Sequence, residues 1–285
     1  MMKKLRTIIT TILVLGLVTT SLLAGCSEQD DTKLKVVTST SLIAQIVERI
    51  GGDMVDVVNI IPPGQCPGHF DCTPGDIQKL ADADLFLLHG WQGETFSDEL
   101  IASANNPDLT VISVDIPSNP QSNWMVPSVQ QEATDVITVA LCQVDAANSS
   151  TYQASADEYK NAVKIKGDEI QDRLTGLNLD SVNVICSGMQ TAFLNWIGFN
   201  VVTFYGRPDT LTPQVVKKIV DEGRANNVIL VIDNMQSGID AGAGVAEELG
   251  CKQLTLSNFP GGYENTDTWE ETIDYNVDLL IDILK

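Results

Sequence analysis

The chain alternates short apolar runs with helical segments, and this alternation restricts the fold more than any other feature of the sequence. The runs are strand-like in length, and they cover residues 33–40, 54–61, 85–90, 182–187, 200–205, 228–233 and 252–257. Helical patterns, such as residues 42–52 and 73–84, separate them. Strands separated by helices of this length pair in parallel through crossover connections. The sequence therefore predicts an α/β fold with two lobes, each a mainly parallel sheet flanked by helices.

A long segment without proline lies between the two groups of strands. Residues 148–174 carry an apolar stripe at helical spacing, formed by Tyr152, Ala156, Tyr159, Val163, Ile170 and Leu174. A helix of this length spans about 40 Å at a rise of about 1.5 Å per residue. We therefore expect residues 148–176 to join an N-terminal lobe (36–147) to a C-terminal lobe (177–285) as a rigid connector. A long surface helix of a single domain is the alternative.

The N-terminus has the pattern of an export signal. Three basic residues precede an uncharged, mostly apolar run that ends in small residues, so residues 1–25 are expected to be cleaved. The closing "LLAGC" resembles the lipobox of bacterial lipoproteins. That resemblance implies that Cys26 is lipidated, that residues 26–35 are a tether, and that the protein is anchored at the outer face of the cytoplasmic membrane. A plain secretory signal is the alternative.

The charge of the chain excludes some partners. Removing the signal, which has three basic residues and no acidic one, would shift the net charge from −21 to −24. So acidic a surface argues against binding to nucleic acid or to anionic lipid headgroups. Any contact with the membrane is therefore expected to occur through the lipid anchor.

The loop "GQCPGHFDCTP" (64–74) holds one of the two histidines of the chain between two cysteines. Cys66, His69 and Cys72 could serve as metal ligands, because thiolate and imidazole bind soft or borderline metals. An exported protein also favours a disulfide between Cys66 and Cys72, and free thiols are a third reading. Five cysteines remain after Cys26, so they cannot all pair within one chain.

Several segments together resemble a known family. "VVTSTSLIAQIVERIGGDMVDVVNIIPPG", "TPGDIQKLADADLFLLHGWQGETF", "NWMVP", "NNVILVIDNMQ" and "TIDYNVDLLIDIL" are similar, in this order, to the metal-binding lipoproteins of bacterial zinc, manganese and iron ABC importers. The resemblance covers essentially the whole mature chain. It implies two α/β lobes joined by a helix, one ligand site in the cleft between them, and an ABC permease with its ATPase as partners. We expect a monomer.

The residues that bind metal in this family are not retained here. The two family histidines fall on Gly68 and Ser122, and the third ligand falls within the segment Ser187–Met189. The family aspartate falls near Ser257 or Asn258. The resemblance thus implies the architecture, while the ligand has to be argued from other residues.

The loops at the carboxyl ends of the strands should line the cleft, as in other open α/β sheets. A closed tetrahedral site of the zinc type would use Cys66, His69, Cys72 and Cys186. Four further candidates are Asp71, Met189, Asp233 and Asn258. The other residues expected to line the cleft are Ser122, Trp124, Met125, Ser187, Met235 and Arg207.

The sequence favours a substrate-binding protein that captures a soft or borderline, zinc-like metal ion. The alternative is the same receptor holding a metal chelate, a haem-like cofactor or a small organic anion, with Cys66 and Cys72 in a disulfide. An enzyme is not expected, since neither C-x-x-C nor a Ser/His/Asp arrangement is present. Cys142 and Cys251 are expected to be small packed residues, and His89 is expected to be a structural hydrogen-bonding residue.

Overall fold

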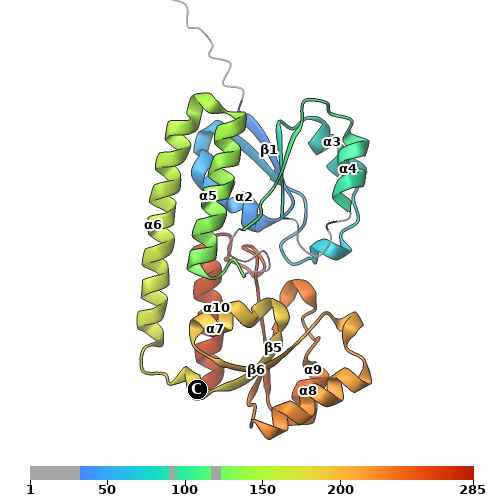
Figure 1. The fold of residues 1–285 in the computed structure, drawn as a ribbon, viewed down its shortest axis with the longest axis vertical. Coiled ribbons are helices and arrows are strands. Elements are labelled where there is room, and N and C mark those ends of the chain that lie inside the picture. Colours follow the sequence, from blue (N-terminus) through green and yellow to red (C-terminus); the bar gives the residue numbers. More distant parts are fainter. Residues whose placement is uncertain (1–32, 90–93, 95, 117–122) are drawn as a thin grey trace, which may run out of the picture. The chain divides into compact units, whose positions relative to one another are not determined.

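The computed structural model describes residues 33–89, 94, 96–116 and 123–285. Its strands form two separate four-stranded sheets, and every strand pair in them is parallel (Figure 1). The first sheet has the order β2-β1-β3-β4 and the second has the order β6-β5-β7-β8. The strands are β1 (Leu34–Thr38), β2 (Val55–Asn59), β3 (Leu85–Leu88), β4 (Thr110–Ser113), β5 (Asn183–Ser187), β6 (Asn200–Tyr205), β7 (Leu230–Asn234) and β8 (Lys252–Leu256).

The two sheets share one topology. In each, the first strand pairs with the second on one side and with the third on the other, and the fourth strand follows the third. The sequence shows no repeat that would have revealed this likeness. The predicted α/β class, with two mainly parallel sheets and a long connecting helix, is confirmed.

Helices connect the strands and flank the sheets. They are α2 (Ser41–Gly51), α3 (Pro74–Ala81), α4 (Phe96–Ala104), α5 (Pro127–Val144), α6 (Ser149–Leu174), α7 (Thr191–Ile197), α8 (Pro213–Ala225), α9 (Ala243–Leu249) and α10 (Trp269–Leu284). Local sequence explains several of their starts. Thr73 and Asp76 form a capping box at the start of α3, and Thr268 and Glu271 form one at the start of α10. None of the helices in the described residues is long and apolar enough to cross a membrane.

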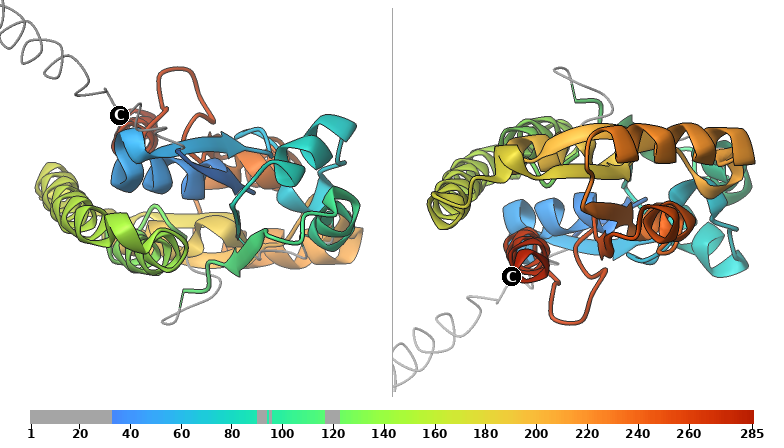
Figure 2. Two further views of the ribbon diagram at one scale, coloured as in Figure 1. Left: turned by 90° about the horizontal axis from the view of Figure 1, so that it is seen from above. Right: turned by 90° about the horizontal axis from the view of Figure 1, so that it is seen from below.

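Helix α6 runs beside α5 on one side of the protein (Figures 1 and 2). The predicted stripe is its buried face, since Tyr152, Ala156, Tyr159, Val163, Ile170 and Leu174 are all buried. The hydroxyl of Tyr159 donates to Gln45 Oε1 (3.1 Å) and accepts from Gln130 Nε2 (3.0 Å). The basic side chains of Lys166 and Arg173 both bind Asp274 of α10. The helix is therefore attached to α2 and α5 in one half and to α10 in the other.

The largest apolar core extends over both sheets. It includes Val36 and Leu87 of the first sheet, Val184 and Leu230 of the second, and the buried face of α6. Two smaller clusters each lie on one sheet, around Phe86 and around Val231. Since one continuous core underlies both sheets and the connecting helix, the loops between the sheets are held on a common support.

Candidate interlobe site

A small cavity lies where loops from the two lobes meet. Its described lining residues are Cys66, Pro67, Met189, Asn234, Gln236, Ser237, Asn258 and Phe259. The first two follow β2, and the others follow β5, β7 and β8 at or after their carboxyl ends. Loops at this edge of a parallel sheet are the usual place for a ligand. The cavity volume is about 10 Å³, at the lower limit for one water-sized body.

A cluster of buried amides includes two residues of the cavity lining, Asn234 and Asn258. Asn123, which precedes α5, donates from Nδ2 to Asn258 Oδ1 (2.8 Å) and to the carbonyl of Met189 (2.9 Å). Gln190 donates from Nε2 to Asn258 Oδ1 (2.8 Å) and to Asn234 Oδ1 (3.1 Å). Since buried polar groups are costly unless they are paired, this saturated cluster fixes the two lobes against each other.

Further contacts join the lobes around the cavity. Gln236 Nε2 donates to the carbonyl of Pro63 (2.8 Å), and Ser41 Oγ donates to the carbonyl of Pro260 (2.8 Å). At a more exposed position, the guanidinium of Arg207 contacts His69 Nε2.

Three of the predicted metal-binding residues share the cavity: Cys66, Met189 and Asn258. The other predicted ligands on the same loop are not among the described lining residues. His69 contacts Arg207, and Asp71 and Cys72 are exposed. Burial and the carboxylates of Asp76, Glu99 and Asp71 raise the pKa of the Cys72 thiol. No disulfide joins Cys66 to Cys72.

Cys186 does not join this loop. It is fully buried in β5 within the large apolar core, with its Sγ 3.6 Å from the hydroxyl of Thr191. Burial raises the pKa of its thiol to about 12. Among the residues that the structure describes, no three His, Cys, Asp or Glu side chains are grouped so that they could hold a metal ion. The predicted four-residue zinc-type set is therefore not assembled in this structure.

Asp233 is buried, and its carboxylate accepts hydrogen bonds from within the C-terminal lobe. Its Oδ1 accepts from the Tyr205 hydroxyl (2.5 Å) and the Gly242 amide (2.7 Å), and its Oδ2 accepts from Gln253 Nε2 (2.5 Å). Burial raises the pKa of this carboxyl, although the hydrogen bonds act in the opposite direction. The side chain holds the end of β7 in place and does not line the cavity.

The remaining predicted residues that the structure describes do not line the cavity. His89 packs on the Trp124 ring (centroids 4.5 Å apart), and its Nδ1 lies 3.3 Å from the Thr40 hydroxyl. Burial lowers the pKa of His89 to about 3, so its ring is neutral. Trp124, Met125 and Ser187 are buried, Met235 is half-buried, and Cys26 and Ser122 lie outside the described residues. Cys142 and Cys251 are half-buried residues packed against core clusters, as expected.

Sequence reasoning missed the amides that build the site. Asn123, Gln190 and Gln236 follow no recognisable ligand motif, and each resembles an ordinary loop residue in the sequence. Their positions give one usable signal: Gln190 and Gln236 lie in the short 3-10 turns that follow β5 and β7, whose carboxyl ends are expected to face the cleft. Their neutral amide side chains match none of the histidine, cysteine or carboxylate patterns that indicate a metal site.

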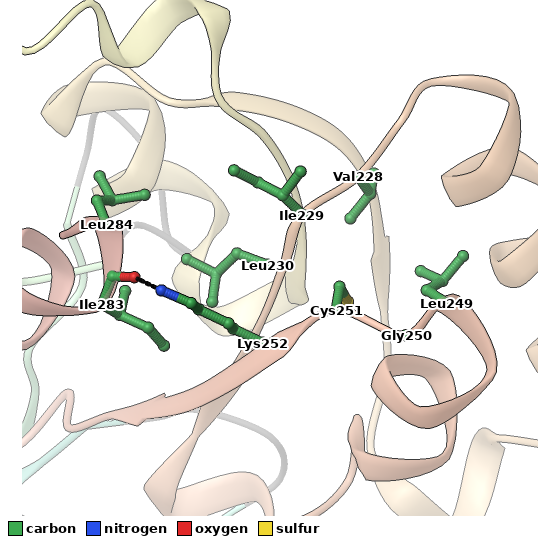
Figure 3. A pocket seen from close by; sticks show the side chains of 9 residues that line it. All are labelled: Val228, Ile229, Leu230, Leu249, Gly250, Cys251, Lys252, Ile283 and Leu284. Carbon is green, nitrogen blue, oxygen red and sulfur yellow. Dashed lines mark hydrogen bonds between the residues drawn. The ribbon is translucent and has the colours of Figure 1, made fainter.

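A larger cavity of about 260 Å³ lies elsewhere in the C-terminal lobe (Figure 3). It is lined mainly by apolar residues at the start of β7, around the start of β8 and at the end of α10. The Lys252 ammonium at its edge donates to the carbonyl of Ile283. Its lining offers Cys251 as the one residue of a metal-binding type, so its size does not make it the better candidate for a metal.

Comparisons with known proteins find metal-uptake and metal-binding proteins of bacteria. The model of a family described as "Zinc-uptake complex component A periplasmic" matches residues 36–283. The manganese-binding lipoprotein MntA of Halalkalibacterium halodurans is 23% identical, over 90% of this chain and 93% of its own. The iron-binding protein YfeA of Yersinia pestis is 25% identical, over 93% and 91%. The manganese-bound periplasmic metal-binding protein of Candidatus Liberibacter asiaticus superposes with a TM-score of 0.76 at 18% identity, covering 89% of this chain and all of that one.

Proposed function

The chain belongs to the family of periplasmic A components of zinc-uptake complexes, and from this membership we propose that it captures a metal ion in the interlobe cavity and delivers it to an ABC permease and its ATPase. It is a substrate-binding protein of a metal ABC transporter and not an enzyme.

The chemistry of the cavity is the observation that carries the proposal. Cys66 supplies a thiol, Met189 a thioether and Asn258 an amide at the same small cavity. Sulfur ligands select soft or borderline metals such as Zn(II), Cu(I) or iron, whereas Mn(II) prefers carboxylate and carbonyl oxygen. We therefore propose a soft or borderline cargo, zinc-like in its demand for sulfur, bound by Cys66 and Met189.

His69, Cys72 and Asp71 stay sequence predictions and are left out of the proposed ligand pair, because none of the three is among the described residues that line the cavity. Cys186 would have to leave a fully buried position and give up a proton in apolar surroundings, which makes it the weakest of the predicted ligands.

The volume of the cavity argues against a larger ligand. Sites for drug-sized molecules have volumes of roughly 300–1,000 Å³, whereas this cavity has about 10 Å³. A chelate, a haem-like cofactor or an organic anion would require the lobes to separate and the buried amide cluster to break. We further propose that the mature protein is a monomer, anchored through a lipid on Cys26 at the outer face of the cytoplasmic membrane.

Elemental analysis of the purified protein, followed by calorimetric titration with Zn, Mn, Fe, Cu, Co and Ni ions, tests the proposal. We expect about one ion per chain, with binding lost in Cys66→Ser and retained in Cys72→Ser, the matched change on the same loop. Thiol counting on metal-free, unreduced protein should find both loop cysteines reactive. Absence of binding for all these ions, or a disulfide between Cys66 and Cys72, would contradict it.

A further inference from the structure

The side chain of Asn123 reaches across the interlobe boundary and bonds two residues of the cavity wall. Asn123 precedes α5 and is buried, with 2% of its surface exposed. Its Nδ2 donates to Asn258 Oδ1 (2.8 Å) and to the carbonyl of Met189 (2.9 Å). Met189 and Asn258 both line the cavity, and they follow β5 and β8 of the second sheet. We call these two hydrogen bonds the latch, because they hold two parts of the cavity wall to the N-terminal lobe.

The backbone of the N-terminal lobe fixes the direction of the latch. The backbone amide of Met125 donates to Asn123 Oδ1 (2.7 Å). A side-chain oxygen bonded to the backbone two residues further on is an Asx turn. Since the oxygen of Asn123 is engaged in this turn, its NH₂ group is the part that faces the second lobe. Both latch partners there are oxygen atoms, so donor and acceptors match.

Neighbouring contacts between the lobes reinforce the latch. Gln236 Oε1 accepts from the backbone amide of Asn258 (3.1 Å), while its Nε2 donates to the carbonyl of Pro63 (2.8 Å). The indole N–H of Trp269 donates to the carbonyl of Trp124 (2.8 Å). All of these bonds, like the latch, join one protein atom to another. They therefore do not depend on a bound ion as a bridge between the lobes.

Opening the cavity requires these bonds to break. The cavity has a volume of about 10 Å³, at the lower limit for one water-sized body. Its wall therefore has to move when an ion with its hydration shell enters or leaves. Movement of the part that carries Met189 and Asn258 separates a buried donor from buried acceptors, which is costly until water replaces the lost partners. The latch thus adds to the barrier for entry and to the barrier for exit.

We propose that Asn123 is a positioning residue that sets the rates of ion capture and release by holding the cavity wall in the ion-free and the ion-loaded protein alike. The inference rests on the proposed function and adds a residue that controls its kinetics. Asn123 is not among the described residues that line the cavity, so it acts through Met189 and Asn258. Loss of the latch should speed association and dissociation together and leave the equilibrium affinity nearly unchanged.

Asn123→Ala and Asn106→Ala form a matched pair of variants. Asn106 makes the same kinds of bonds within the N-terminal lobe. Its Nδ2 donates to the carbonyls of Leu80 (3.1 Å) and Ala83 (2.8 Å), and its Oδ1 accepts from the backbone amide of Asp108 (3.1 Å). Each substitution removes two donated bonds and one Asx turn, and those of Asn106 lie away from the lobe boundary. Thermal unfolding of both variants shows how much stability each one loses.

Stopped-flow kinetics with Zn(II) alone as the probe measures the rates. Transfer of Zn(II) to an excess of a chromogenic chelator reports dissociation, tryptophan fluorescence reports association, and calorimetry gives Kd. Asn123→Ala should raise both rate constants at least about tenfold, equivalent to about 1.4 kcal/mol, and should keep Kd within about threefold of the parent value. Asn106→Ala should leave both rate constants unchanged.

Exchange of the Trp269 indole proton, followed by NMR, tests the latch without any ion. This N–H is buried and donates across the lobe boundary, so it reaches solvent when the lobes separate. Its exchange should be at least about tenfold faster in Asn123→Ala and unchanged in Asn106→Ala. An equal change in both variants would show that the proton exchanges through unfolding, and would overturn the inference.

The outcomes distinguish the inference from the proposed function. If Asn123→Ala raises Kd with an unchanged association rate, Asn123 helps to hold the ion itself; the inference is overturned and the proposed function stands. Equal rates in Asn123→Ala and the parent protein also overturn the inference alone. If Zn(II) does not bind to the parent protein, the zinc-like cargo is overturned. In that case the indole exchange alone supports or overturns the latch.

Discussion

Helix α6 passes the start of α5 at Gly167, and this close approach predicts that an alanine at position 167 destabilises the protein. A Cβ atom built on Gly167 would lie 2.8 Å from Cγ and 3.2 Å from Cβ of Pro127, and 3.9 Å from Cζ2 of Trp196. Contacts below 3.0 Å force atoms to move, and the proline ring at the first turn of α5 is rigid. Either α6 or α5 would therefore have to shift.

Two opposing effects set the magnitude. Replacing glycine by alanine inside a helix stabilises it by about 0.8–1.0 kcal/mol. Overpacking a well-packed core typically costs about 1–3 kcal/mol. The net expectation for Gly167→Ala is a loss of up to about 2 kcal/mol in the free energy of unfolding. Gly244 in α9 is the matched control, because a Cβ there has no atom within 4 Å. Gly244→Ala should stabilise the protein by up to about 1 kcal/mol.

Urea denaturation, followed by circular dichroism, measures both variants against the parent protein. The midpoint should fall for Gly167→Ala and rise for Gly244→Ala, with unchanged slopes. If Gly167→Ala stabilises the protein as much as Gly244→Ala does, the helices do not meet closely at Gly167. In that case α6 would not pack against the start of α5 in solution as it does in this structure.

Three further predictions concern the residues around the cavity. Burial lowers the pKa of His89 from 6.5 to about 3, so between these pH values the unfolded state binds a proton that the folded state does not. The contribution of His89 to the free energy of unfolding is therefore complete above pH 6.5. Below pH 6.5 the free energy of unfolding falls by up to about 1.4 kcal/mol per pH unit. His89→Gln should flatten the unfolding free energy between pH 6.5 and 5, and an unchanged slope would contradict the assignment. Asn258→Asp keeps the oxygen that accepts from Asn123 and Gln190 but adds a negative charge to the cavity lining. The affinity for Zn(II), measured by calorimetry, should therefore rise at least about tenfold. An unchanged affinity would contradict the placement of the ion in this cavity. Gln236→Ala removes the donor to the Pro63 carbonyl (2.8 Å) and should lower the unfolding free energy by about 1–3 kcal/mol, whereas an unchanged midpoint would show that this contact is absent in solution.

The architecture could be predicted from the sequence because the patterns that indicate strands and helices are local and recur along the chain. Apolar runs and helical stripes marked seven of the strands, and the six stripe positions of the connecting helix are buried as predicted. The strand β4 was missed. It is short, and its residues are half-buried or exposed, so it lacks the continuous apolar run that identified the others.

The site was harder to predict because it depends on side-chain direction. Cys66 and Cys72 are six residues apart on one loop, yet one lines the cavity and the other is exposed. Cys186 lies at the expected end of β5, but it belongs to the buried face of that strand. Loop conformation and strand facing are decided by packing across the lobes, which no single segment of the sequence encodes. The amide cluster arises in the same way, from residues distant in the chain.

The metal K-edge X-ray absorption spectrum of the ion-loaded protein tests most directly whether the interlobe cavity binds its cargo through sulfur. We expect sulfur neighbours at about 2.3 Å, as in other thiolate sites, with one of them lost in Cys66→Ser. A first shell of oxygen and nitrogen alone, or a spectrum that Cys66→Ser leaves unchanged, would contradict the assignment of this cavity as the metal site.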